Sequence, residues 1–292
     1  MFPEARFDEP MSRHTSFRIG GPADAYIEVE HWTDLKRIHA LAGRADLPLF
    51  FLGGGSNLLV LDGGIRGLVL RLRGAFEAID PLGENGVWVG AGTRVEHLVR
   101  WCVFRGLAGA EPLTGIPGTI GGALVMNAGA RESGIGGLVR RVEVFEPAGL
   151  ESARIPRSRL RFGYRSSSLG ERLILGAALK LKPGNKVDII ERVQEYRRRR
   201  RETQPYQAFT VGSTFKNPPG RFAGKLIQEA GLKGARVGGA RVSAVHANFI
   251  ENTGGAQASD VLSLVDAVRG AVRARSGVEL ELEMQVVGEY LR

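Results

Sequence analysis

The chain contains a single cysteine, Cys102, among its 292 residues. One cysteine excludes an internal disulfide and any metal site built from several thiolates. The five histidines show no HExxH-like spacing, so we expect no metal site. No apolar run is long enough to cross a bilayer, and the N-terminal MFPEARFDEP has no signal-peptide core. We therefore expect a soluble, cytoplasmic protein with no membrane partner.

Acidic residues are fewer than basic residues. Lysine and arginine total 40 against 31 aspartates and glutamates, which gives a net charge of +9 and a pI near 10.1. Such a balance favours an anionic partner, either nucleic acid or a phosphorylated small molecule. The run YRRRRR at 196–201 has no aromatic stacking platform beside it. We expect no nucleic-acid partner, and one or two of these arginines are candidates for gripping a substrate diphosphate.

Glycine, by contrast, is abundant, with 41 residues in short clusters inside apolar segments. The run FFLGGGSNLLV at 50–60 reads as a buried strand that ends in three glycines, a serine and an asparagine. Glycines allow positive φ and let a ligand approach the backbone N–H groups, which together form an anion cradle. The ligand that such a cradle usually binds is a phosphate or pyrophosphate. The alternative is a tight turn with no ligand.

A second loop, GIPGTIGGA at 115–123, continues to Ala130 and is nearly free of charge. Neither loop has the GxGxxG spacing, and GxxxxGK[ST] occurs nowhere in the chain. Two such loops predict a dinucleotide held outside a Rossmann fold, which points to a different FAD-binding architecture.

Hydrophobic patterning predicts an α+β protein. Strands and helices alternate in 14–74 and again in 75–183, and an amphipathic helix follows over Val187–Arg201. The remainder reads as a small domain with helices over Ala223–Ala230 and from Ser259-Asp260 to Ser276-Gly277. Its predicted strands are Ala247–Glu251 and Val278–Val287. We therefore expect three domains or subdomains, at residues 1–74, 75–190 and 191–292.

Two segments near the C-terminus concentrate reactive side chains. GSTFKNP at 212–218 brings a hydroxyl, a cation and an amide together, but without a GxSxG elbow Ser213 is no hydrolase nucleophile. In the last predicted strand Glu279, Glu281 and Glu283 share one face. That face is either a charged outer surface or the wall of a cleft, where mutual repulsion would raise a carboxyl pKa.

Taken together, these segments resemble the UDP-N-acetylenolpyruvoylglucosamine reductases (the MurB family) of bacterial peptidoglycan synthesis. The matching motifs, in order, are TSFRIGG at 15–21, GGGSNLLV at 53–60, GIPGTIGGA at 115–123, GYR at 163–165, GSTFKNP at 212–218, AGKLI at 223–227, HANF at 246–249 and LELE at 280–283. The resemblance implies an α+β FAD-binding domain of the vanillyl-alcohol-oxidase type, made of two subdomains, followed by a substrate-binding domain.

The resemblance also implies the cofactors and the reaction. NADPH supplies a hydride through noncovalent FAD to UDP-N-acetylglucosamine enolpyruvate, which becomes UDP-N-acetylmuramate, and the protein acts as a monomer. The implied FAD-binding residues are Gly53, Gly54, Gly55, Ser56, Asn57 and Leu58 in the first loop and Gly115, Ile116, Pro117, Gly118, Thr119, Gly121 and Gly122 in the second.

Three catalytic residues follow from the same resemblance: Arg165 at the substrate carboxylate, Ser213 as general acid, and Glu283 in charge stabilisation or proton delivery. Serine is a weak acid, so cations and dipoles must lower the cost of its alkoxide. The implied substrate contacts are Arg201 at the diphosphate, Lys216, Asn217 and His246.

The chain departs from the family pattern in three places. His14 stands where asparagine is common, Gln285 stands where some members have an arginine near the flavin, and 181–201 lacks a tyrosine-bearing loop. Two other readings stay open: an FAD-dependent alcohol or sugar oxidase of the same fold, and a non-catalytic nucleic-acid-binding protein. The oxidase would have no reason to carry GSTFKNP, AGKLI and the terminal LELE.

Overall fold

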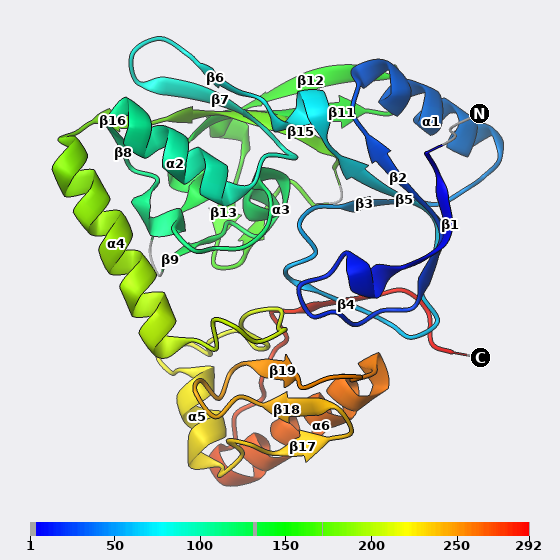
Figure 1. Ribbon diagram of the computed structural model, residues 1–292, viewed down its shortest axis with the longest axis vertical. Coiled ribbons are helices and arrows are strands. Elements are labelled where there is room, and N and C mark those ends of the chain that lie inside the picture. The colour runs from blue at the N-terminus through cyan, green and yellow to red at the C-terminus, as the bar shows by residue number, and fades with distance from the viewer. Residues whose placement is uncertain (1–3, 131–132, 171, 292) are drawn as a thin grey trace. The chain divides into compact units, whose positions relative to one another are not determined.

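A computed structural model of the chain describes residues 4–130, 133–170 and 172–291 (Figure 1). The chain folds into two compact units. Unit 1 contains residues 1–5, 27–54 and 68–200, and unit 2 contains 6–26, 55–67 and 201–292. The first glycine loop is therefore divided after Gly54. Among the described residues, no helix has the length and apolar character needed to span a membrane.

Unit 1 is built on a five-stranded antiparallel sheet of order β12-β11-β15-β7-β6. Its strands are β6 (Ile79–Pro81), β7 (Gly86–Gly90), β11 (Val139–Glu146), β12 (Glu151–Pro156) and β15 (Ile174–Lys180). The central strand β15 is buried at every position except its last, as expected for a strand covered on both faces. Helix α3 (Ile120–Val125) packs on β7 and β15 (Figure 1).

The other helices of unit 1 are amphipathic. They are α1 (Trp32–Arg44), α2 (Val95–Arg105) and α4 (Lys186–Thr203), whose last residues lie in unit 2. Helix α2 ends at Gly106, whose φ of 66° is the left-handed conformation that glycine adopts without strain. Its buried face carries Cys102, and burial raises the pKa of that thiol to about 12.

Strand β3 (Leu49–Leu52) pairs in parallel with the second half of β5 (Ile65–Leu72), and the first glycine loop follows β3 directly. Short paired strands complete unit 1: β8 (Leu107–Ala108) with β16 (Lys182–Pro183), β9 (Gly129–Ala130) with β10 (Ser133–Gly134), and β13 (Phe162–Gly163) with β14 (Ser166–Ser167). Single-turn 3₁₀ helices lie at Met11–Arg13, Gly74–Glu77, Glu111–Leu113, Ile135–Gly137 and Arg157–Arg159.

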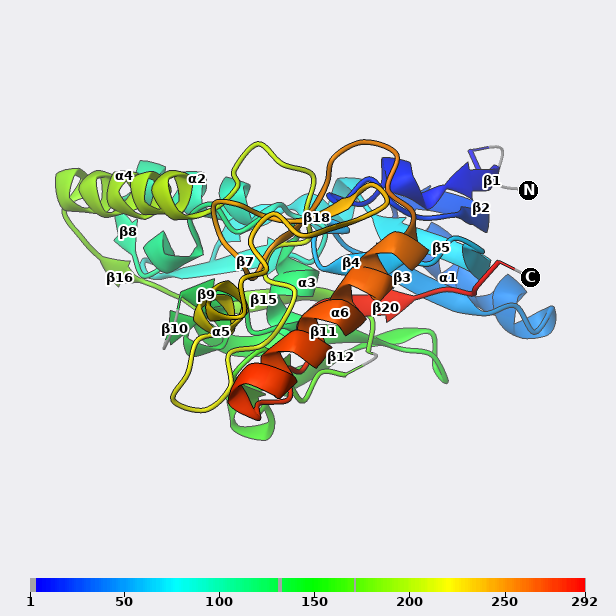
Figure 2. The same cartoon turned by 90° about the horizontal axis from the view of Figure 1, so that it is seen from below.

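Unit 2 contains a three-stranded sheet and two further strand pairings. Strand β1 (Arg6–Pro10) pairs with β2 (Pro22–Val29), β4 (Leu58–Val60) pairs in parallel with β20 (Gln285–Val287), and the sheet contains β17 (Arg236–Val237), β18 (Ala240–Val242) and β19 (Ile250–Asn252). Helix α6 (Ala258–Ser276) packs on β17, β18 and α5 (Ala223–Glu229), as Figures 1 and 2 show. Gln257 and Asp260 cap it in a capping box, and Gly277 ends it with φ 68°.

Two predicted strands are wrong in extent. The segment 247–249 belongs to a turn, closed by the Phe249 N–H on the His246 carbonyl, so only Ile250–Asn252 is a strand. The predicted strand Val278–Val287 is regular only at its end, as β20, because the 278–284 segment makes a single isolated bridge from Leu282 to Phe215. The alternation still governs exposure there, since Leu280 and Met284 are buried and Glu281 is exposed.

Candidate active site

The two glycine loops meet in unit 1, backbone against backbone. A methyl group added to Gly54 would lie 2.4 Å from the Gly118 Cα, and one added to Gly53 would lie 2.9 Å from Thr119 Oγ1. No side chain fits in the first of these gaps. Only glycine at position 54 allows the loops to approach this closely.

Backbone hydrogen bonds attach the second loop to the segment between β7 and α2. The Ile120 N–H donates to the Thr93 carbonyl and the Gly121 N–H to the Ala91 carbonyl, both at 2.9 Å, and Val95 N–H donates to Gly118 at 3.1 Å. Gly118 has φ 108°, which a residue with a side chain would adopt only with strain. The loop is therefore a rigid feature of the main chain.

The rest of the first loop belongs to unit 2 and packs on His14. A methyl group added to Gly55 (φ 62°) would lie 2.0 Å from the His14 carbonyl oxygen. The His14 ring stacks on Tyr26, with centroids 4.1 Å apart, and its Nε2 lies 2.9 Å from Glu9 Oε1. This hydrogen bond holds the pKa of Glu9 below its usual range. The His14 ring is therefore held between Tyr26 and Glu9, while its main-chain carbonyl packs against the loop.

Arg165 occupies the turn between β13 and β14 in unit 1. Its φ of 52° is left-handed, which is uncommon for a residue with a side chain. Its guanidinium lies 5.2 Å from the Tyr164 ring centroid, and its Nη1 is 3.5 Å from the Gly129 carbonyl oxygen.

A second arginine, Arg200, lies against the same part of unit 1. A methyl group added to Gly115 would lie 2.7 Å from the Arg200 Cδ, so the arginine stem covers this end of the second loop. Burial lowers the pKa of Arg200, and the charge of Arg165 lowers it further. The predicted diphosphate ligand, Arg201, is instead exposed and lies 5.6 Å from the Tyr206 ring centroid. Arg200 belongs to the run of candidate diphosphate ligands, and nothing in the sequence of that run distinguishes it from Arg201.

In unit 2, hydrogen bonds join the segments that carry Ser213 and Glu283. The Glu283 N–H donates to the Thr214 carbonyl at 2.9 Å, and the Lys216 N–H donates to the Glu281 carbonyl at 2.8 Å. The two predicted catalytic residues are thus brought to neighbouring segments, although 70 positions separate them in sequence (283 minus 213).

The end of the first glycine loop joins this pair of segments. Asn57 Nδ2 donates to the Glu283 carbonyl at 3.0 Å, and the Gln285 N–H donates to the Asn57 carbonyl at 2.9 Å. Strand β4, which follows Asn57, pairs with β20, which follows Glu283. Unit 2 therefore joins the end of a predicted cofactor loop to the main chain of Glu283, a predicted catalytic residue.

Asn248 is a buried residue that sequence reasoning did not select. Its Nδ2 donates to the Phe215 carbonyl at 2.8 Å, its Oδ1 accepts from the Phe215 N–H at 3.0 Å, and its carbonyl accepts from the Thr214 N–H at 2.8 Å. The side chain thus substitutes for a strand partner beside Ser213. The HANF motif was visible, but sequence could not show which of its residues faces the GSTFKNP segment.

The predicted substrate contacts in unit 2 have structural partners. Lys216 Nζ is ion-paired with the Glu281 carboxylate, and Asn217 Oδ1 accepts from the Ala223 N–H at 3.0 Å, at the start of α5. His246 Nδ1 accepts from the Asn248 N–H at 3.2 Å, which places the ring proton of the neutral form on Nε2. Burial lowers the pKa of His246.

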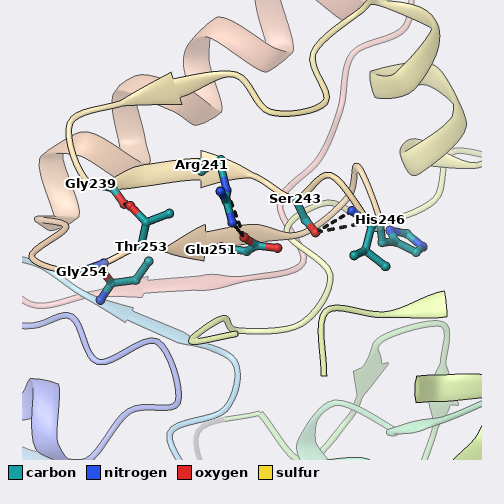
Figure 3. Close-up of polar contacts among 9 residues, drawn as sticks. Gly239, Arg241, Ser243, His246, Glu251, Thr253 and Gly254 are labelled. Carbon is teal, nitrogen blue, oxygen red and sulfur yellow. Dashed lines mark hydrogen bonds and ion pairs between the residues drawn. The ribbon is translucent and has the colours of Figure 1, made fainter. Parts of the chain in front are cut away.

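Figure 3 shows His246 beside Ser243, whose Oγ accepts from the His246 N–H at 3.4 Å. The neighbouring strands β18 and β19 are joined by an ion pair between Arg241 and the buried Glu251, with a closest distance of 2.6 Å. This ion pair joins the two strands that flank the turn with His246.

Family models cover most of the chain. Residues 23–150 match the FAD binding domain, and residues 204–287 match the UDP-N-acetylenolpyruvoylglucosamine reductase C-terminal domain. The chain belongs to the UDP-N-acetylenolpyruvoylglucosamine reductase family. The predicted α+β fold with an FAD-binding domain is confirmed, and the protein is an FAD-containing oxidoreductase.

Close relatives span the whole chain. The UDP-N-acetylenolpyruvoylglucosamine reductase of Rubrobacter xylanophilus is 45% identical, over 99% of this chain and 97% of its own length. The enzyme numbered 2 of Symbiobacterium thermophilum is 46% identical, over 96% and 91%. The crystal structure of the Thermus caldophilus UDP-N-acetylenolpyruvylglucosamine reductase is 41% identical and superposes with a TM-score of 0.84, covering 98% of each chain.

The residues of both loops fit the FAD that the family implies. Gly54 and Gly118 bring the main chains of the two loops together, and glycine-rich main chain can offer backbone N–H groups to a pyrophosphate. Within the described ranges, no group of three or more histidine, cysteine, aspartate or glutamate side chains could hold a metal ion.

Proposed function

We propose that this chain reduces UDP-N-acetylglucosamine enolpyruvate to UDP-N-acetylmuramate, with NADPH as hydride donor, in the synthesis of peptidoglycan precursors. The observation that supports the proposal is the backbone hydrogen bond from the Glu283 N–H to the Thr214 carbonyl, which joins the segment of Glu283 to the segment of Ser213. An oxidase of the same fold would have no use for a serine proton donor.

We propose that FAD binds to the main chain of the two loops, at Gly53–Leu58 and Gly115–Gly122. When bound, FAD accepts two electrons from NADPH and passes them to the vinyl group of the substrate. The glycines support this assignment because their packing leaves only backbone N–H groups and small side chains to face a dinucleotide.

Arg165 is proposed to bind the substrate carboxylate. Negative charge develops on the carboxylate side when the terminal vinyl carbon gains a hydride, and a guanidinium stabilises that charge with two parallel hydrogen bonds. The left-handed backbone at Arg165 supports the role, because strained residues persist where function requires a particular side-chain direction.

Ser213 is proposed to donate the proton that completes the reduction at the other vinyl carbon. A hydroxyl gives up its proton readily only where the alkoxide is stabilised, and Lys216 supplies positive charge three residues away along the same segment. Glu283 is proposed to assist through charge stabilisation or proton delivery. Lys216, Asn217, His246 and Arg201 are proposed to contact the UDP-sugar.

We also propose that the protein is a monomer and that it lies in the cytoplasm. We propose two FAD-binding subdomains at 1–74 and 75–190 and a substrate-binding domain at 191–292. Size-exclusion chromatography coupled to light scattering gives the mass of the species in solution, and a dimer would contradict the first statement.

The function is tested by reducing the purified holoenzyme with NADPH under anaerobic conditions, then adding UDP-N-acetylglucosamine enolpyruvate and following the flavin absorbance. Rapid return of the oxidised spectrum supports the proposal. A flavin that stays reduced until air is admitted would make the protein an oxidase. Acid precipitation provides a second readout, because noncovalent FAD remains in the supernatant.

A further inference from the structure

Arg165 lies in the turn of a hairpin that is too short to stabilise the conformation of this turn by itself. Strands β13 and β14 form only two residue pairs, Phe162 with Ser167 and Gly163 with Ser166. Tyr164 and Arg165 make the turn between them, and the φ of Arg165 is 52°. So short a hairpin is not stable by itself, and a left-handed residue with a side chain adds strain. Contacts from outside the hairpin must therefore keep Arg165 in place.

Asn127 makes the first such contact and uses both ends of its amide. Its Nδ2 donates to the Gly163 carbonyl at 2.8 Å, and its Oδ1 accepts from the Gly136 N–H at 3.0 Å. One end meets a donor and the other an acceptor, so only one amide orientation satisfies both. Glycine at 134 makes room, since a methyl group there would lie 2.2 Å from Asn127 Oδ1.

Ser167 makes the second contact, from the other strand of the hairpin. Its Oγ donates to the Val125 carbonyl at 2.9 Å, at the C-terminal end of α3, and α3 lies beside β14. Val125 and Asn127 directly follow the second glycine loop in sequence. Both strands that flank Arg165 are thus tied to the segment that continues the predicted flavin loop.

We propose that Asn127 is a positioning residue for Arg165: its amide holds the Gly163 end of the turn so that the Arg165 guanidinium meets the substrate carboxylate. The inference rests on the proposed role of Arg165. The bond from Asn127 to Gly163 acts through the orientation of that guanidinium. Its loss therefore affects the step that uses the enolpyruvyl carboxylate and leaves flavin binding and reduction by NADPH in place.

Asn127→Gly is the appropriate variant. Asn127 has φ 45°, so glycine preserves the backbone, whereas alanine would add strain. We expect the rate of flavin reoxidation by substrate to fall about 10²-fold, as for a misplaced catalytic group. FAD content and the rate of reduction by NADPH should stay at wild-type values. The matched control is Asn185→Gly, which removes the 2.8 Å bond from the Val187 N–H at the start of α4 and should leave both rates unchanged.

A double-mutant cycle tests whether Asn127 acts through Arg165. In an Arg165→Gln background, Asn127→Gly should cause no further loss of reoxidation rate. A full additional loss would overturn the proposal. Asn127→Asp keeps the acceptor for Gly136 but loses the donor to Gly163, so it should be as slow as Asn127→Gly. Wild-type rates in Asn127→Asp would equally contradict the assignment.

Ser167→Ala provides an independent test should Asn127→Gly fail to retain FAD. It removes the second tie and should slow reoxidation by substrate with no effect on reduction, and its loss should likewise vanish in the Arg165→Gln background. Equal loss in both backgrounds would refute the proposal. Failure of the proposed function itself looks different, because the wild-type flavin would then not be reoxidised by the substrate at all.

Discussion

Asn248 and Phe215 exchange two hydrogen bonds, with the Asn248 amide bonded to both the N–H and the carbonyl of Phe215 at 3.0 and 2.8 Å. The pattern imitates a strand pairing, but with a side chain on one side. It holds the residues that follow Ser213 at a point where no regular sheet continues. A buried side chain thereby takes over what a strand does elsewhere.

Replacing Asn248 with alanine should lower the free energy of unfolding by about 2–4 kcal/mol, because both polar groups of the buried Phe215 would lose their partner. Denaturant titration measures this loss. Thr253→Ala is the control, since exposed Thr253 also bonds a backbone carbonyl, at 2.9 Å to Gly239. Its removal should cost under about 1 kcal/mol. Equal losses would show that burial of the Asn248 bonds is unimportant.

Ser213→Ala should separate the two half-reactions. NADPH should still bleach the flavin at the wild-type rate, whereas reoxidation by substrate should slow by about 10²–10⁴-fold, the usual value of a lost general acid. Stopped-flow absorbance measures both phases. Exposed Ser259→Ala serves as the control and should change neither. Wild-type reoxidation in Ser213→Ala would remove serine from the mechanism.

Glu283 and Glu281 allow a matched comparison within one segment. Glu283→Gln removes the carboxylate of the proposed catalytic residue and should slow the substrate half-reaction by about 10²-fold or more. Glu281→Gln breaks the exposed ion pair with Lys216. Such pairs contribute about 0–1 kcal/mol, so stability and both half-reactions should change little. Steady-state kinetics and thermal denaturation of the two variants test this, and equal kinetic effects would contradict a specific role for Glu283.

Gly54→Ala should weaken FAD binding, because its methyl group would collide with the Gly118 main chain 2.4 Å away and drive the loops apart. The purified variant should contain less FAD per chain, and equilibrium dialysis should give a higher Kd. Gly270→Ala, at an exposed position of α6, is the counterpart, as no heavy atom lies within 4 Å of the added methyl. It should retain FAD and gain up to about 1 kcal/mol of stability from helix propensity. Full FAD content in Gly54→Ala would show that the close approach is unnecessary.

The lowered pKa of His246 makes stability depend on pH. In the unfolded chain His246 binds a proton near its ordinary pKa of about 6.5, whereas in the folded chain it does so only at lower pH. Below pH 6.5 the unfolded state therefore binds more protons, and the free energy of unfolding decreases as pH falls. We expect stability to decrease from about pH 6.5 downward until the folded pKa is passed, and to be independent of this histidine above pH 7. His246→Asn offers an acceptor in place of Nδ1 and cannot titrate. Its urea midpoint should fall less between pH 7 and 5.5 than that of the wild type, and parallel curves would exclude the effect.

Much of the local structure follows from the order of residues along the chain. Helices α5 and α6 lie within one residue of the predicted ranges, because a 3.6-residue period is a property of neighbouring residues. The family motifs also depend on linear spacing, and they led to the FAD-binding fold and the reductase family that the relatives confirm. The strand predicted at Val278–Val287 is wrong in extent, because its partner, the 214–216 segment, pairs with it only at isolated points.

Only the tertiary structure determined which residues distant in sequence contact one another. The contact of Gly54 with Gly118, the placing of Arg200 instead of Arg201 against Gly115, and the bond from Asn127 to Gly163 each join segments far apart in the chain. No local pattern records such contacts, because their free energy is gained only after the intervening residues have folded and closed the loop between them. Sequence by itself determined the elements and the motifs, and three-dimensional packing determined which residue of each motif is held in position.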